Sequence, residues 1–172
     1  NYGIILRDLG KLKEADLWMR KAIELNPDSA IANSNLGMIL IDLNNLHEAQ
    51  LYTRRAIEIK PDYSEAHFNL GVILKGLGKS KEAELSTRKA IELKPDFADA
   101  HLQLGNILRD LGKLKEAELS TRNAIKFKPD FADAYFNLSL LELLQGDYEA
   151  GLENYEYRFK KKDAKNILNG FS

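Results

Sequence analysis

Small, apolar and turn-forming residues recur along this chain at a constant spacing. The four prolines stand 34 residues apart, at Pro27, Pro61, Pro95 and Pro129. The same spacing aligns one glycine column and two alanine columns. These are Gly3, Gly37, Gly71 and Gly105; Ala15, Ala49, Ala83 and Ala117; and Ala22, Ala56, Ala90 and Ala124. Self-similarity at a fixed period is the signature of a repeat protein, so we read the chain as consecutive 34-residue units.

Within each unit the apolar positions follow helical spacing and predict two helices. In the fourth unit these helices cover residues 98–111 and 114–127. Asp96 is the expected N-cap of the first helix, and Asp99 adds a capping-box-like carboxylate. Gly112 is the expected turn residue between the two helices. Pro129 then ends the second helix.

The small columns have a packing explanation. Two helices joined by a short turn approach closely only where the facing side chains are small. The glycine column and the first alanine column permit this approach within a unit, and the second alanine column lets the next unit dock. A single hairpin cannot bury its apolar face, so the units are expected to stack into an all-α solenoid.

These residues resemble the tetratricopeptide repeat, which has a 34-residue period. The Leu-Gly pair, the alanines and the proline carry the resemblance over nearly the whole chain. The chain departs from the family pattern where bulky aromatics are usual, at Asn33, His67, His101 and Tyr135 and at Thr53, Thr87 and Thr121. The resemblance implies a right-handed superhelix of antiparallel helix pairs. We expect the departures in both columns to loosen the local packing without changing the fold.

The period also sets the expected domain organisation, a single domain over residues 1–172. It comprises a truncated repeat (1–29), complete repeats (30–63, 64–97 and 98–131), a divergent terminal repeat (132–165) and a tail (166–172). Asn1 would fall midway along a first helix, so we expect half of that helix to be missing. Arg158 replaces the docking alanine, which predicts that regular stacking stops there.

The resemblance places the first helix of each repeat on a concave groove. One groove column is made of amides, at Asn1, Asn35, Asn69, Gln103 and Asn137. An amide both donates and accepts hydrogen bonds, so such a column can hold a peptide backbone. It resembles the asparagine ladder in the repeat arm of O-linked N-acetylglucosamine transferases. The alternative is that the amides form hydrogen bonds between adjacent repeats.

Apolar residues are predicted to line the same groove, where they would select apolar side chains of a peptide. The alternative is that neighbouring repeats cover them. The candidate peptide-binding residues are Asn35, Met38, Phe68, Asn69, Val72, Leu102, Gln103, Asn106, Phe136 and Asn137. Nearby, Arg7, Lys75 and Arg109 share a column beside Asp8, Asp42 and Asp110, and these charges are expected to pair within the chain.

Composition narrows the function classes further. The net charge of −1 gives no support for nucleic acid or for an anionic membrane as partner. No cysteine is present, and neither a membrane-spanning run nor a signal peptide is visible, so we expect a cytoplasmic protein. His47, His67 and His101 lack the spacing of a metal site. Because no catalytic motif occurs either, we expect no enzyme activity, no metal and no cofactor.

The sequence therefore predicts a non-catalytic scaffold that binds a protein or an extended peptide in the concave groove. Two alternatives stay open. The chain resembles bacterial, especially cyanobacterial, repeat regions that precede glycosyltransferase or sulfotransferase domains, so it could be the substrate-recruiting arm of a larger enzyme. It could also be a homo-oligomerisation module, in which apolar grooves or open ends pair between chains.

Overall fold

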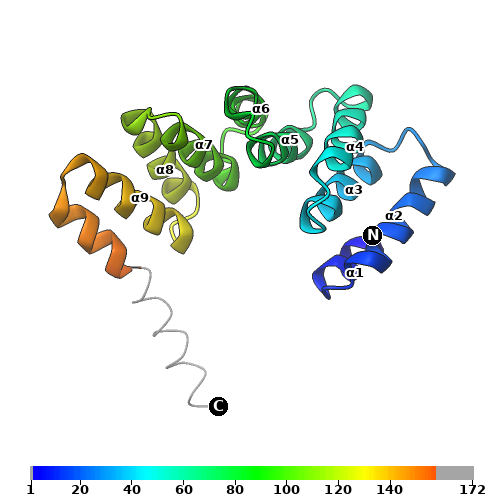
Figure 1. Ribbon diagram of the computed structural model, residues 1–172, viewed down its shortest axis with the longest axis horizontal. Helices are drawn as coiled ribbons and strands as arrows, with labels where there is room; N and C mark the ends of the chain where they lie inside the picture. Colours follow the sequence, from blue (N-terminus) through cyan, green and yellow to red (C-terminus); the bar gives the residue numbers. More distant parts are fainter. Residues whose placement is uncertain (1, 158–172) are drawn as a thin grey trace, which may run out of the picture. The chain divides into compact units, whose positions relative to one another are not determined.

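The computed structural model describes residues 2–157, and every regular element among them is a helix (Figure 1). The chain forms two compact units, Asn1–Pro95 and Asp96–Ser172. Unit 1 contains α1 (Tyr2–Asp8), α2 (Leu12–Leu25), α3 (Ala30–Asp42), α4 (Leu46–Ile59), α5 (Ser64–Gly76) and α6 (Ser80–Leu93). Unit 2 contains α7 (Ala98–Asp110), α8 (Leu114–Phe127), α9 (Ala132–Gln145) and a further helical stretch at 148–157. The expected all-α fold of paired helices is confirmed.

The two helices of each repeat pack closely because small residues lie between them. In the α5–α6 pair, an added Cβ on Gly71 would overlap the hydroxyl of Thr87 and lie 3.4 Å from the carbonyl oxygen of Ala83. Gly37 meets Thr53 and Gly105 meets Thr121 in the same way. The threonines therefore sit tightly on the glycine backbone, fully buried, instead of loosening the packing as the sequence had suggested.

The turns within the repeats use residues in the left-handed backbone region. Gly10, Gly78, Gly112 and Gly146 have φ angles of +74°, +74°, +75° and +87°. In the second repeat Asn44 occupies the equivalent place at φ +57°. Glycine adopts this conformation without the strain that a Cβ causes, and asparagine tolerates it better than most residues. The turn predicted at Gly112 is confirmed, and the same position forms the turn in the other repeats.

The predicted N-caps are wrong by one residue. The N-cap of α7 is Phe97, which follows Asp96, and it makes no side-chain capping hydrogen bond. Tyr63 and Phe131 take the same place before α5 and α9. Only the second repeat follows the capping rule among the described first helices, because Ser29 Oγ accepts a hydrogen bond from the backbone N–H of Ala32. At the other repeats an aromatic side chain at this position packs instead.

Apolar side chains fill the space between the helices of each unit. The core of unit 1 joins residues from several repeats, including Leu36, Ile39, Leu40 and Ile73. The core cluster of unit 2 is Ala98, Leu102, Ala124, Phe131 and Ala134. Each hairpin thus buries its apolar face against the next one in its unit, as expected for stacked repeats. The predictions about Arg158 and about the tail at 166–172 concern residues outside the described range.

Candidate functional site

First helices of neighbouring repeats lie side by side within each unit, α3 beside α5 and α7 beside α9. The structure therefore brings the candidate residues together in two groups. The group in unit 1 is Asn35, Met38, Phe68, Asn69 and Val72. The group in unit 2 is Leu102, Gln103, Asn106, Phe136 and Asn137.

The two amides of unit 1 have different surroundings. Asn69 is only 7% exposed, and its Nδ2 donates a hydrogen bond of 3.3 Å to Ser34 Oγ on the preceding repeat. Asn35 is half-buried and keeps more surface for an external partner. Ser34 also hydrogen bonds to Tyr63, but burial dominates and raises the pKa of that phenol. The inter-repeat role weighed above for the amides is thus observed at Asn69.

Three apolar candidates of unit 1 remain partly accessible. Met38, Phe68 and Val72 are half-buried, and Ile31 at the start of α3 is 56% exposed. These side chains accompany Asn35 on two adjacent helices. A surface that combines an amide with apolar groups can hold a peptide backbone and also contact its side chains.

The amides of unit 2 are also divided between two environments. Asn137 Oδ1 accepts a hydrogen bond of 3.1 Å from Arg109 Nη1, which joins α9 to α7. Gln103 and Asn106 are half-buried on α7. Arg109 Nη2 additionally lies 3.5 Å from the carboxylate of Asp110. Asn137 would have to exchange its bond to Arg109 before its oxygen could accept one from a ligand.

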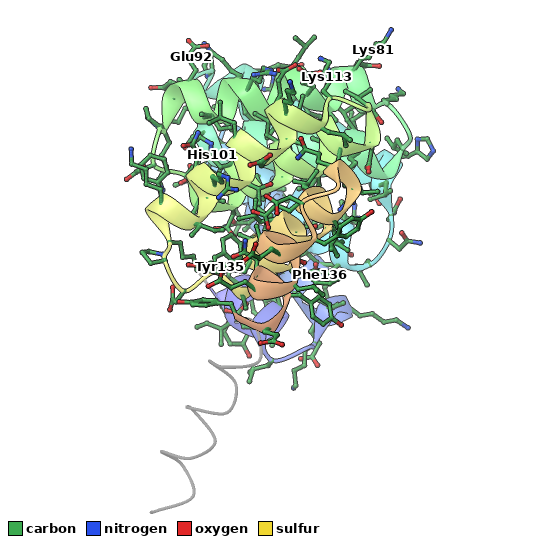
Figure 2. All side chains as sticks on the ribbon, turned by 90° about the vertical axis from the view of Figure 1, so that its left-hand side faces the viewer. Lys81, Glu92, His101, Lys113, Tyr135 and Phe136 are labelled. Carbon is green, nitrogen blue, oxygen red and sulfur yellow. The ribbon has the colours of Figure 1, made fainter. Side chains whose placement is uncertain are left out.

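Leu102 and Phe136 differ in accessibility although both were predicted to select apolar side chains. Leu102 is 8% exposed and belongs to the unit-2 core, so it offers little contact surface. Phe136 is half-buried, and its ring centroid lies 6.1 Å from that of Tyr155. Figure 2 shows Phe136 and the neighbouring Tyr135 on different sides of α9. Tyr135 contacts Tyr157 instead, with 4.0 Å between the ring centroids and the ring planes tilted by 31°.

The charged column beside the candidate site pairs within the chain, as expected for Arg7 and Arg109. Arg7 forms an ion pair with Asp42 on α3 and lies 3.9 Å from Asp8. The pair with Asp42 ties the first helices of two consecutive repeats together. The outer faces of second helices carry similar pairs, for example Arg88 with Glu84 at 2.9 Å, which agrees with a solvated charged face.

Two of the three histidines, His67 and His101, have structural partners. His67 Nε2 donates to the carbonyl oxygen of Pro61 at 2.9 Å. The buried ring of His101, labelled in Figure 2, stacks on Phe127 with 5.3 Å between centroids. Over residues 2–157 no group of three or more potential ligands could hold a metal ion. Within that same range, no helix has the length and apolar character needed to cross a membrane.

Sequence reasoning missed a leucine column on the second helices. Its members are strongly exposed: Leu17 68%, Leu51 66%, Leu85 71% and Leu119 64%. They recur with the same period as the prolines, and that periodicity in an otherwise charged helix face was the available signal. Beside Leu85 lies a cavity of about 390 Å³ bordered by α4, α5 and α6.

The fold defines a helical-repeat protein built from antiparallel hairpins. Sequence models described as "Tetratricopeptide repeat" match residues 1–29, 18–51, 52–84 and 87–118, and one described as "TPR repeat" matches 105–146. The chain therefore belongs to the tetratricopeptide-repeat family.

Solved structures of other repeat proteins share this fold. MamA is 21% identical with a TM-score of 0.82, and the alignment covers 97% of this chain and 98% of MamA. PilF of Pseudomonas aeruginosa is 19% identical with a TM-score of 0.85, over 92% of this chain and 72% of PilF. YrrB, described as a TPR protein with an unusual peptide-binding site, is 24% identical with a TM-score of 0.71, over 93% and 82%. The search of curated proteins gave no significant match.

Proposed function

We propose that this protein is a non-catalytic scaffold that binds an extended peptide segment of a partner protein on its first helices. The observation that carries the proposal is the pairing of accessible amides with apolar side chains on adjacent first helices. In unit 1 this surface comprises Asn35, Met38, Phe68 and Val72. In unit 2 the half-buried amides are Gln103, at the repeat position of Asn35, and Asn106, at the repeat position of Met38 and Val72.

Family membership and one structural relative support a peptide as the ligand. YrrB has a peptide-binding site and shares the fold. The primary amides of Asn35, Gln103 and Asn106 can each donate to a peptide carbonyl and accept from a peptide N–H. Such contacts hold the backbone of many sequences, while Phe68 and Met38 would favour apolar side chains. Asn69 and Asn137 contribute less directly, because each already serves a bond between repeats.

A peptide-display selection tests this function directly. The parent protein and the variant Asn35→Ala/Gln103→Ala would be exposed to the same random-peptide library. We expect the parent to enrich extended peptides with apolar residues and the variant to lose them while keeping its helical circular dichroism. Equal enrichment by both proteins would contradict a role for these amides.

A matched control shows whether the loss of peptides is specific to substitutions on the first helices. The variant Glu92→Ala/Lys113→Ala changes two exposed side chains, labelled in Figure 2, that lie outside the candidate site. It should retain the peptides selected by the parent. If this control loses them as well, the selected peptides bind elsewhere and the first-helix surface is not the site.

The resemblance of the amide column to the repeat arm of O-linked N-acetylglucosamine transferases supports a related second hypothesis. In that case the bound peptide segment belongs to the substrate of an enzyme domain, and this chain recruits that substrate to the enzyme. Self-association is the third possibility, and light scattering over a range of concentrations distinguishes it. A mass that stays at one chain favours the peptide scaffold, whereas a mass that doubles with concentration favours homo-oligomerisation.

A further inference from the structure

The cavity on unit 1 is the strongest candidate for an additional binding site. Its volume of about 390 Å³ lies in the range of small-ligand pockets. Three aliphatic side chains and three polar ones form most of its lining. These are Ile57, Leu70 and Leu85, together with Arg54, His67 and Ser86. Because second helices supply most of this lining, the cavity is separate from the first-helix surface proposed above.

The internal repeat identifies the residue that creates this cavity. One repeat earlier, the positions equivalent to Arg54, Ile57 and Leu85 hold the same residue types, Arg20, Ile23 and Leu51. The position of Ser86, however, is occupied by a tyrosine. Tyr52 packs against the core of unit 1 at that place. The third repeat therefore keeps these three residues but has a serine where the preceding repeat has a phenol ring, and His67 where that repeat has Asn33.

The contacts of Tyr52 show how the equivalent arginine of the preceding repeat binds a phenol ring. The guanidinium carbon of Arg20 lies 5.7 Å from the Tyr52 ring centroid, and Arg20 Nη1 donates to the hydroxyl at 3.3 Å. Arginine beside an aromatic face is a favourable cation–π arrangement. The chain thus contains, one repeat away, its own example of a tyrosine that packs on the core and is bound by the equivalent arginine.

Arg54, the counterpart of Arg20, is held more loosely than Arg20. Arg20 lies 3.0 Å from Asp16 and 2.7 Å from Glu48. For Arg54 the first carboxylate is replaced by the neutral Gln50, and the second, Glu82, lies 3.9 Å away. Arg54 can therefore turn toward a ligand without giving up a short ion pair.

We propose that this cavity binds a tyrosine side chain presented by a partner protein, in the way that Tyr52 is held one repeat earlier. The ring would rest on Ile57, Leu70 and Leu85, and its hydroxyl would accept a hydrogen bond from Arg54. The protein would then have a second binding site, on a different surface from the peptide site on the first helices.

The test uses N-acetyl-L-tyrosinamide as the probe in an NMR titration of the full chain. We expect saturable shifts of the His67 ring signals and the Leu85 methyl signals. N-acetyl-L-phenylalaninamide lacks the hydroxyl and should bind about two- to tenfold more weakly, the loss expected for one neutral hydrogen bond. Equal affinity of the two probes would overturn the predicted contact with Arg54.

Two variants complete the test. Ser86→Tyr places a tyrosine of the chain itself in the cavity, as in the preceding repeat. This variant should therefore fold, and the probe should no longer cause shifts. Lys81→Tyr adds the same side chain to the same helix at an exposed position outside the cavity (Figure 2), and it should bind the probe like the parent. Shifts that persist in Ser86→Tyr, or that are absent from the parent, would overturn the proposal.

Discussion

Asn69 on α5 donates a hydrogen bond to Ser34 on α3 across 3.3 Å, and both residues are buried. The bond joins the first helices of two successive repeats at the column that the sequence suggested for peptide binding. Asn69 therefore links two repeats, as Asn137 does through its hydrogen bond with Arg109. The function of the others has to be tested separately from this structural contribution.

The first prediction concerns that bond. Asn69→Ala leaves the buried Ser34 hydroxyl without one partner, so the free energy of unfolding should fall by about 1–2 kcal/mol. Asn35→Ala removes a half-buried amide at the equivalent position and should cost about 0.5 kcal/mol or less. Urea denaturation followed by circular dichroism measures both. Equal losses for the two variants would show that the Ser34 bond contributes nothing specific.

A second prediction addresses the contact between glycine and threonine inside the hairpin. Gly71→Ala places a methyl group against the Thr87 hydroxyl and should destabilise the protein by about 1–3 kcal/mol through overpacking. Thr87→Ala removes the obstructing atoms, so the double variant should lose less than the sum of the two single losses. Urea unfolding of the four proteins completes the cycle. Strict additivity would contradict the steric explanation.

A third prediction follows from a buried carboxylate in unit 2. Glu142 is 2% exposed and occupies the repeat position that Leu108 holds one repeat earlier. Its carboxylate forms an ion pair with Arg122 at 2.8 Å and accepts a hydrogen bond from Asn154 at 2.7 Å. Arg122→Ala should cost about 1.5–3 kcal/mol, because the carboxylate loses its charged partner. Glu142→Leu should be neutral or stabilise by about 1–4 kcal/mol.

The combined variant supplies the control for this pair. Once Glu142 is leucine, no buried charge depends on Arg122, so adding Arg122→Ala should have little further effect. Thermal unfolding of all variants tests this expectation. An unchanged cost of Arg122→Ala in the leucine background would show that the arginine acts through Glu118, its other partner at 2.8 Å.

The fourth prediction concerns acid. A hydrogen bond from Arg20 lowers the pKa of Glu48 below its ordinary value of 4.5. The unfolded chain therefore takes up this proton at higher pH than the folded chain does. The resulting stabilisation is present above pH 4.5 and is lost as the pH falls through the lowered pKa. Glu48→Gln should flatten this part of the stability–pH curve.

Glu82→Gln is the matched control for the acid experiment. Glu82 holds the equivalent position one repeat later but lies 3.9 Å from Arg54, against 2.7 Å between Glu48 and Arg20. Chemical denaturation between pH 3 and pH 7 should reveal a smaller change for this variant. If the two substitutions flatten the curve equally, the short contact with Arg20 is not the cause.

The sequence by itself determined the repeat length, the helix pairs, the turn glycines and the family. These features depend on local backbone preferences and on which residues are small or apolar, and the 34-residue period records both. The helix limits at 98–110 and 114–127 accordingly match the expectation closely. The N-caps were less predictable, because the aromatic at Phe97 packs where Asp96 was expected to cap.

Only the tertiary structure decided which residues of a column are available. Asn35 and Asn69 occupy the same repeat position, yet one is half-buried and the other is buried against Ser34. Leu102 likewise belongs to the core although its periodicity placed it on the groove. The physical reason is that exposure depends on side chains supplied by neighbouring helices, and the spacing along one helix does not contain that information.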